Sequence, residues 1–193
     1  MGSTPDEILA GRVGELGLTR ADGPIHLAES DPAWPGLYER EADRIRAILG
    51  DRAIRLEHVG STSIPGLAAK PIIDIVLVVT DSADEAAYLR PLVADGYVLR
   101  IREPEWFEHR LLNGPDTKVN LHVFSDGCPE IERMVAFRDY VRAHDEERQQ
   151  YEGAKRELAA QHWVYVQDYA DAKSEVVEAI IARASAAVDG TVG

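Results

Sequence analysis

The spacing of apolar residues changes several times along the chain. Residues 24–28, 53–59 and 97–102 have the short apolar runs of strands, and residues 71–79 are apolar enough for a strand buried on both faces. Between them, apolar side chains at helical spacing predict helices over residues 32–49 and 82–95. The order strand, helix, strand, strand, helix, strand favours an α/β protein.

Particular residues predict where these helices begin and end. Asp31 followed by Pro32 is typical of an N-cap with proline in the first turn, and Gly50 suits the left-handed residue that ends a helix. Ser82 with Glu85 three positions later has the spacing of a capping box.

The second half begins with a hairpin and ends with helices. Residues 106–113 and 117–124 predict two antiparallel strands that extend the sheet, and in the second of them Lys118, Asn120 and His122 share one polar face. Residues 131–143, 146–161 and 166–184 predict helices. We therefore expect an α/β (α+β) fold: a mixed β-sheet core, flanking helices and a helical C-terminal third.

Length and composition indicate one folded domain. The 193 residues, 45% hydrophobic and 28% charged, suit a single domain, which we place at residues 24–186, after an N-terminal extension (1–23) and before a frayed tail (187–193). No run approaches the ~20 apolar residues of a membrane span, and the N-terminus lacks the pattern of a signal peptide, so we expect a cytoplasmic protein.

Charge and cysteine content narrow the function further. The net charge of −13 opposes binding to a long nucleic acid and leaves a small molecule, a nucleotide or a protein as partner. The one cysteine, Cys128, stands in a predicted turn and excludes an intramolecular disulfide or a thiolate-rich metal site.

Asp74 is the residue that the apolar pattern explains least, because it interrupts a strand expected to be buried. A carboxylate there is either a ligand for Mg²⁺ or Mn²⁺, or a structural acid paired with a nearby base. The loop Gly60-Ser61-Thr62-Ser63, just before this strand, has the small and hydroxyl side chains of a phosphate-binding loop, although they are also common in ordinary turns.

Histidines and basic residues supply further candidates. His58, His109 and His122 are candidate ligands for Zn²⁺ or Mn²⁺ together with Asp74, or structural histidines. Several basic side chains are candidate phosphate ligands, with solvated helix faces as the alternative: Lys70, Arg138, Arg142, Lys155 and Lys173. We expect Trp106 and Phe107 to pack rather than to stack on a base.

Residues 58–75, HVGSTSIPGLAAKPIIDI, closely resemble the hallmark of the GrpB family. The resemblance covers roughly residues 25–184. Its other segments are DPAWP at 31–35, NLHV at 120–123, FRDYVR at 137–142, and the pairs Tyr151 with Lys155 and Tyr169 with Lys173. It implies a nucleotidyltransferase-like core, and similar domains are fused to dephospho-CoA kinases in actinobacteria, where a folding-accessory role has been suggested.

The nucleotidyltransferase pattern pairs a Gly-Ser dipeptide with two acids, two residues apart, that hold two metal ions. Gly60, Ser61 and Asp74 match it, but Val76 stands in place of the second acid, so that Glu57, Glu108 or His122 would have to replace it.

Three functions therefore stay open. The first is metal-dependent nucleotidyl transfer from a nucleoside triphosphate, in which Ser61 and Thr62 hold phosphate, Asp74 binds Mg²⁺ or Mn²⁺, and Glu108 or His122 completes the site. The second is a catalytically inactive domain that binds a ligand or a protein. The third is a hydrolase that uses His58, His122 and Asp74 as metal ligands.

Overall fold

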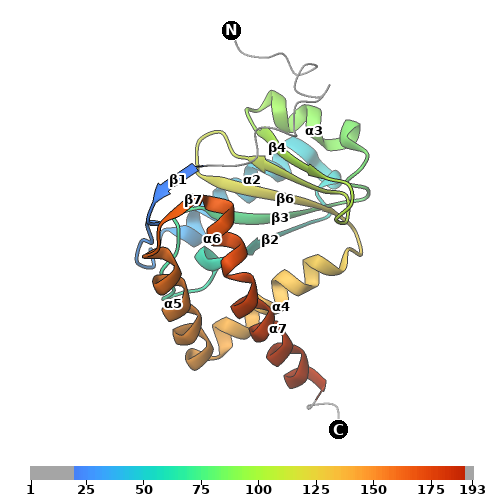
Figure 1. Ribbon diagram of the computed structural model, residues 1–193. Coiled ribbons are helices and arrows are strands. Elements are labelled where there is room, and N and C mark those ends of the chain that lie inside the picture. The colour runs from blue at the N-terminus through green and yellow to red at the C-terminus, as the bar shows by residue number, and fades with distance from the viewer. Residues whose placement is uncertain (1–19, 190–193) are drawn as a thin grey trace.

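The computed structural model describes residues 20–189, and the predictions for residues 1–19 and 190–193 lie outside this range. Its centre is a five-stranded sheet in the order β2-β3-β6-β5-β4 (Figure 1). The strands are β2 (Arg55–Val59), β3 (Ile73–Val79), β4 (Val98–Glu103), β5 (His109–Asn113) and β6 (Val119–Ser125). Only β3 and β6 run parallel; the other neighbours are antiparallel. The predicted mixed sheet and the predicted hairpin are confirmed.

Helices cover both faces of this sheet. On one face, α2 (Trp34–Leu49) and α3 (Glu85–Ala94) bury the apolar side of β3 and β6 in the main hydrophobic core. On the other face, α4 (Pro129–Ala143) packs Ile131 against Val76, Val78 and Phe124. Because β3 is apolar on both sides, it is the strand that both layers bury.

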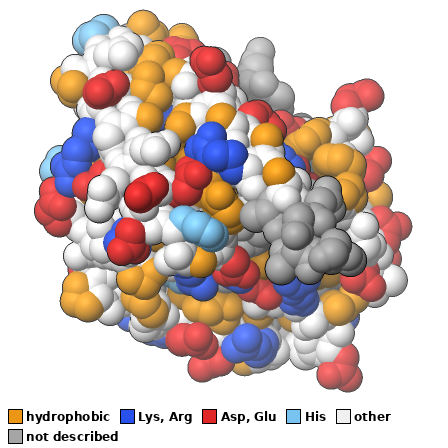
Figure 2. All heavy atoms as spheres, turned by 90° about the horizontal axis from the view of Figure 1, so that it is seen from below, with side chains coloured by type: hydrophobic (Ala, Val, Ile, Leu, Met, Phe, Trp, Pro, Cys, Tyr) orange, Lys and Arg blue, Asp and Glu red, His pale blue; other side chains and the backbone are white. Residues whose placement is uncertain are grey.

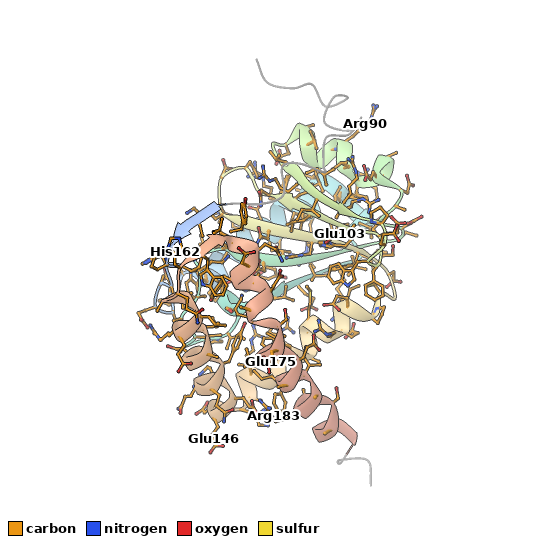
Figure 3. All side chains as sticks on the ribbon, in the orientation of Figure 1. Arg90, Glu103, Glu146, His162, Glu175 and Arg183 are labelled. Carbon is orange, nitrogen blue, oxygen red and sulfur yellow. The ribbon has the colours of Figure 1, made fainter. Side chains whose placement is uncertain are left out.

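The C-terminal third is helical, as the sequence predicts. It contains α5 (Asp145–Ala159), α6 (Val166–Ala172) and α7 (Ser174–Asp189), which lie beyond α4 on the same side of the sheet (Figure 1). Phe137 and Val141 of α4 pack there against Tyr151 of α5 and Ile180 of α7. Arg183, labelled in Figure 3, donates to the carboxylate of Glu147 at 2.6 Å and ties α7 to α5.

Several predicted boundaries are wrong. Residues 24–27 form no strand; instead β1 (Arg20–Gly23) pairs with the unpredicted short strand β7 (Trp163–Tyr165), and Ala28 makes an isolated bridge to Ala69. The expected helix 166–184 is interrupted at Lys173, and α7 continues to Asp189, into the predicted tail.

Side-chain contacts and backbone conformation explain further differences near α3 and β5. The predicted capping box does not form, because the Ser82 hydroxyl bonds the Ser125 hydroxyl and the Glu85 carboxylate accepts from Arg102 and Arg110. The strand predicted from residue 106 begins only at His109, since positive φ angles at Phe107 and Glu108 turn the chain between β4 and β5.

Candidate functional site

The end of β2 and the start of β3 place Asp74 beside the loop that contains Gly60. Val59 and Asp74 are register partners in the antiparallel pair, and Gly60 then leaves the strand with φ 67° and ψ −174°. A Cβ atom at Gly60 would lie 2.3 Å from Asp74 Oδ2. The glycine is therefore required both by its backbone conformation and by the carboxylate that lies against it.

A cavity of about 470 Å³ opens between this face of the sheet and the C-terminal helices. The sheet contributes Asp74, Asn120 and His122 to its wall. The loop contributes Gly60, Ser61 and Thr62, and the segment before β3 contributes Lys70. The helices complete the wall with side chains that include Tyr151, Lys155, Tyr169 and Lys173.

The Asp74 carboxylate has two polar neighbours on β6. Asn120 donates its amide to Asp74 Oδ1 at 2.9 Å, and His122 Nε2 lies 3.9 Å from the same oxygen. Burial raises the pKa of Asp74, but the interactions with His122, Asn120 and Lys173 outweigh it, and the pKa stays below its usual range. At neutral pH this residue is a carboxylate that faces a cavity.

Three lysines converge on the same cavity. Burial and, to a smaller extent, a neighbouring lysine lower the pKa of Lys155 to about 7 and that of Lys173 to about 8. Burial also lowers the pKa of Lys70, against the opposing effect of Asp74. These ammonium groups have given up hydration, which is costly unless an anion replaces the water.

Two tyrosines support the lysines. Lys155 Nζ lies 5.0 Å from the ring centre of Tyr151 and donates to Ala68 O at 2.5 Å. Lys173 Nζ lies 4.7 Å from the ring centre of Tyr169, and Lys70 Nζ lies 5.9 Å from the same ring centre. Each tyrosine precedes its lysine by four residues, a spacing that places both on one helix face or at one helix end. The pairing of each lysine with a tyrosine could therefore be predicted from the sequence.

The hydroxyl residues of the loop divide into two roles. Ser61 lines the cavity, where its hydrogen bond with Tyr151 partly opposes the rise in the pKa of Tyr151 caused by burial. Thr62 uses its hydroxyl inside the fold, donating to Ile72 O at 3.1 Å, and Ser63 donates to Gly60 O at 2.6 Å. Because the Thr62 and Ser63 hydroxyls are bonded to the backbone, the Ser61 hydroxyl is the candidate among the three for contact with a ligand.

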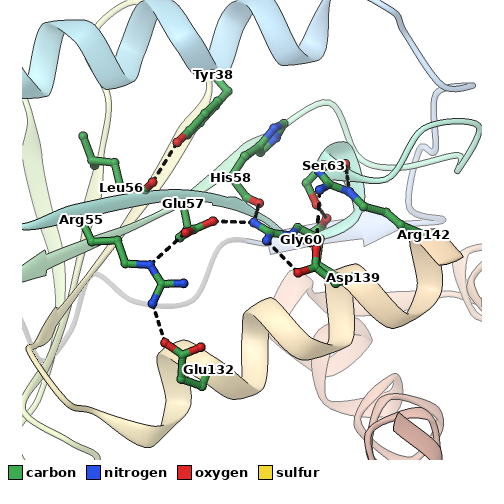
Figure 4. A network of polar contacts seen from close by, with 11 residues as sticks. Tyr38, Arg55, Leu56, Glu57, His58, Gly60, Ser63, Glu132, Asp139 and Arg142 are labelled. Carbon is green, nitrogen blue, oxygen red and sulfur yellow. Dashed lines mark hydrogen bonds and ion pairs between the residues drawn. The ribbon is translucent and has the colours of Figure 1, made fainter. Parts of the chain in front are cut away.

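The predicted phosphate ligands Arg138 and Arg142 lie outside the cavity wall and brace the loop from α4. Arg142 donates to Ser63 O at 2.9 and 2.5 Å, as Figure 4 shows. Arg138 donates to the Glu57 carboxylate at 2.6 Å and to His58 O at 3.0 Å. Both guanidinium groups hold α4 against β2 and the loop that follows it.

Three predicted metal ligands also lie away from Asp74. His58 stacks on Tyr38 on the opposite face of the sheet, with ring centres 4.8 Å apart, and burial lowers its pKa to about 4. The Glu108 carboxylate accepts from Arg110 at 3.2 Å in the β4–β5 turn, and Glu57 pairs with Arg55 and Arg138. Within residues 20–189, no three side chains of His, Cys, Asp or Glu gather as a metal site.

His122 is connected to a second histidine. His109 Nε2 lies 3.1 Å from His122 Nδ1, and His109 Nδ1 lies 2.7 Å from the Glu103 carboxylate. The rings of Phe124 and Trp106 pack against His109. Trp106 thus makes packing contacts as expected, although it and Phe107, the other aromatic residue expected to pack, both remain exposed. Burial, together with His122 and Arg110, lowers the pKa of His109 to about 3.

The outer surface carries both signs of charge. Acidic and basic side chains are interspersed on the face seen in Figure 2, without a continuous basic area among the side chains drawn in colour. Over residues 20–189, none of the helices combines the length and apolar character that crossing a membrane requires.

Comparisons with known proteins agree with this architecture. The model of the family described as "GrpB protein" matches residues 24–183. A UPF0157 protein of Halalkalibacterium halodurans is 57% identical over 183 residues, 95% of this chain and 93% of its own. The crystal structure of the conserved protein GrpB from Enterococcus faecalis has a TM-score of 0.70 at 29% identity, covering 82% of this chain and 96% of that one.

A longer protein contains a similar segment. A dephospho-CoA kinase of Mycolicibacterium paratuberculosis is 30% identical over 164 residues, which are 70% of this chain and 40% of the kinase. The family model covers nearly the whole described structure, including the loop and strand that hold Gly60 and Asp74. The chain belongs to the GrpB family.

Proposed function

We propose that the cavity binds a nucleoside triphosphate together with a divalent cation and transfers the nucleotidyl group to an acceptor. The observation that carries this proposal is the convergence of Lys70, Lys155 and Lys173 on the single carboxylate of Asp74. The family resemblance adds the Gly60-Ser61 pair and its relation to the strand of Asp74.

The charges in the cavity call for an anionic ligand. Three lysines face one isolated carboxylate, because the other acid in the wall, Glu130, is paired with Arg133 at 2.8 Å. A triphosphate would supply the missing negative charge and replace the lost hydration of the ammonium groups. The volume of about 470 Å³ is in the range of small-molecule sites.

The described residues fit a divalent cation only in a limited way. With one carboxylate and no cluster of three acidic or histidine ligands, the protein would hold an ion weakly by itself. Mg²⁺ is commonly bound by one or two carboxylates plus substrate phosphates, and Asp74 can supply that carboxylate. When bound, such an ion supplies charge neutralisation at the phosphates.

The protein's own residues would orient the ligand. Lys70 and Lys173 both lie near the ring of Tyr169, at 5.9 and 4.7 Å from its centre, and would hold phosphate oxygens, and the Ser61 hydroxyl would donate to another. Helices α5, α6 and α7 cover this face of the sheet and would exclude water from the reacting phosphate.

A second function has its own supporting observation. A similar segment occupies 40% of a dephospho-CoA kinase, and the acid expected at position 76 is a valine. Both fit a domain that binds a phosphorylated ligand without chemistry. Such a domain would bind the triphosphate but release it unchanged, so product analysis separates the two functions.

Thermal unfolding with a panel of nucleoside triphosphates, with and without Mg²⁺ or Mn²⁺, tests the binding. At 100 times the dissociation constant, a ligand adds about 2.7 kcal/mol of stability, which raises the midpoint by about 5–11 °C for a chain of this size. Asp74→Asn should remove the metal-dependent part of the shift, whereas Asp126→Asn, an exposed acid at the end of β6, should keep it. No shift with any nucleotide would contradict the proposal.

Triphosphate affinity should fall as the pH rises from 7 to 9. The pKa of Lys173 is about 8 and that of Lys155 about 7, so both lose their charge in this window, and an anion binds the charged forms. For each lysine that must be protonated, the loss is about tenfold or more. Calorimetric titration at several pH values checks this. Lys173→Arg, whose guanidinium stays charged, should flatten the profile; an unchanged profile would argue against a role for Lys173.

A further inference from the structure

A line of polar side chains, hydrogen-bonded from Glu103 as far as His122, leads from the surface toward Asp74. It begins at Glu103, labelled in Figure 3 at the end of β4, whose side chain is 45% exposed. Its carboxylate lies 2.7 Å from His109 Nδ1, and His109 Nε2 lies 3.1 Å from His122 Nδ1. His122 Nε2 then faces Asp74 Oδ1 at 3.9 Å.

The partners in this line determine which nitrogen atoms carry hydrogen. A carboxylate only accepts, so His109 donates from Nδ1 to Glu103. With Nδ1 of His109 directed at Glu103, its Nε2 is placed to accept from Nδ1 of His122. In that tautomer of His122, Nε2 has the lone pair and is the ring atom that faces Asp74.

This arrangement puts two electron-pair donors opposite each other. His122 Nε2 and Asp74 Oδ1 are 3.9 Å apart, beyond the distance of a direct hydrogen bond, and Asn120 donates to the same oxygen at 2.9 Å. Cation–ligand distances of about 2.0–2.2 Å allow two ligands of one ion to be up to roughly 4.2 Å apart. The limit applies to a linear arrangement, and neighbouring ligands in tetrahedral or octahedral coordination lie about 3.0–3.4 Å apart. From the observed 3.9 Å, one ion can therefore contact both atoms after they approach by roughly 0.5–0.9 Å.

We propose that Asp74 Oδ1 and His122 Nε2 jointly bind one divalent transition-metal ion, such as Mn²⁺ or Zn²⁺, in preference to Mg²⁺, and that His109 and Glu103 position the imidazole. The imidazole ligand carries the preference, because Mg²⁺ favours oxygen ligands. His122 is the register partner of Val76 across the parallel pair β3–β6, so the imidazole occupies the neighbouring strand beside the valine. This inference rests on the proposed function, since phosphate and water would complete the coordination.

The outer residues have a defined role in this proposal. A ligating histidine usually donates its other N–H to an acceptor, which fixes the ring, and removing that acceptor typically costs 10–100-fold in metal affinity. His109 is this acceptor, and Glu103 keeps His109 in the accepting tautomer. His109 and Glu103 are positioning residues, which act on the ion only through His122.

Electron paramagnetic resonance of the full chain with Mn²⁺, alone and with inorganic tripolyphosphate, tests the inference. The free-ion signal measures binding, and spin-echo modulation reports a nitrogen atom bound directly to Mn²⁺. We expect nitrogen coupling in the wild type, its loss in His122→Ala, and a 10–100-fold weaker affinity with coupling retained in His109→Phe, which keeps an aromatic ring in the buried position. His162→Ala, an exposed histidine labelled in Figure 3, should match the wild type.

Different outcomes separate this inference from the proposed function. Mn²⁺ that binds through Asp74 without nitrogen coupling, or no Mn²⁺ binding with or without tripolyphosphate, would overturn the metal site. Equal Mn²⁺ affinity in the wild type and in His109→Phe would overturn the positioning role, and Glu103→Gln gives a second test if His109→Phe does not fold. A lysine-dependent nucleotide shift would stand in each of these cases.

Discussion

The double substitution of Lys70 and Lys173 by methionine should reduce triphosphate affinity by about two to four orders of magnitude, since each hydrogen bond to a charged group contributes about 1.5–3 kcal/mol. Both ammonium groups line the cavity near Tyr169, and methionine keeps most of the volume without the charge. Isothermal titration calorimetry with the nucleotide that gives the largest thermal shift is the measurement.

The same variant should be more stable than the wild type in the absence of ligand. Burial lowers the pKa of both lysines, which means that the folded protein disfavours their charged forms. Removing them relieves that cost, so the unfolding midpoint of the free protein should rise while the ligand-induced shift disappears. Opposite changes of stability and binding are typical of residues kept for a ligand.

Lys118→Met is the matched control for this experiment. Lys118 is an exposed lysine just before β6 that lies outside the wall of the main cavity. The Lys118→Met variant should bind triphosphate with the affinity of the wild type, apart from a small effect of the changed net charge. If Lys118→Met weakened binding as much as the double variant, the attraction would come from general charge and not from the cavity.

Gly60→Ala should destabilise the fold by roughly 2–4 kcal/mol and lower the unfolding midpoint by about 4–16 °C. The φ of 67° with ψ of −174° is nearly exclusive to glycine, and the added Cβ would lie 2.3 Å from Asp74 Oδ2. Either the loop or the Asp74 carboxylate must move, and a movement of the carboxylate disturbs the hydrogen bond that it accepts from Asn120. The variant should also lose metal-dependent binding of the triphosphate, because the displaced carboxylate is the one proposed to hold the ion.

Gly153→Ala provides the comparison in the same chain. Gly153 lies in the middle of α5 with no atom within 4 Å of an added Cβ, so alanine should stabilise the helix by up to about 1 kcal/mol. Thermal unfolding of both variants measures the difference. A midpoint for Gly60→Ala close to that of the wild type would mean that the loop can relax, contrary to the close approach described above.

The amino-acid sequence alone determined the main elements and the central position of Asp74. Helical spacing and the apolar run at residues 71–79 required no tertiary information, because local periodicity reports which face is buried. Polar alternation in β6 likewise predicted that Asn120 and His122 share a face, and both line the cavity with Asp74. Short strands such as β7 were missed because three residues carry too little pattern.

Only the tertiary structure decided which basic and acidic residues face the cavity. Lys155 and Lys173 reach it, whereas Arg138 and Arg142 brace the loop, although all four had similar helical contexts in the sequence. The β2–β3 register pairs Val59 with Asp74 and so turns His58 to the opposite face. The pairing of Glu103 with His109 across β4 and β5 likewise depends on the turn at residues 104–108. Such contacts join residues whose spacing in the chain carries no periodic signal, so the packing of strands and helices decides them.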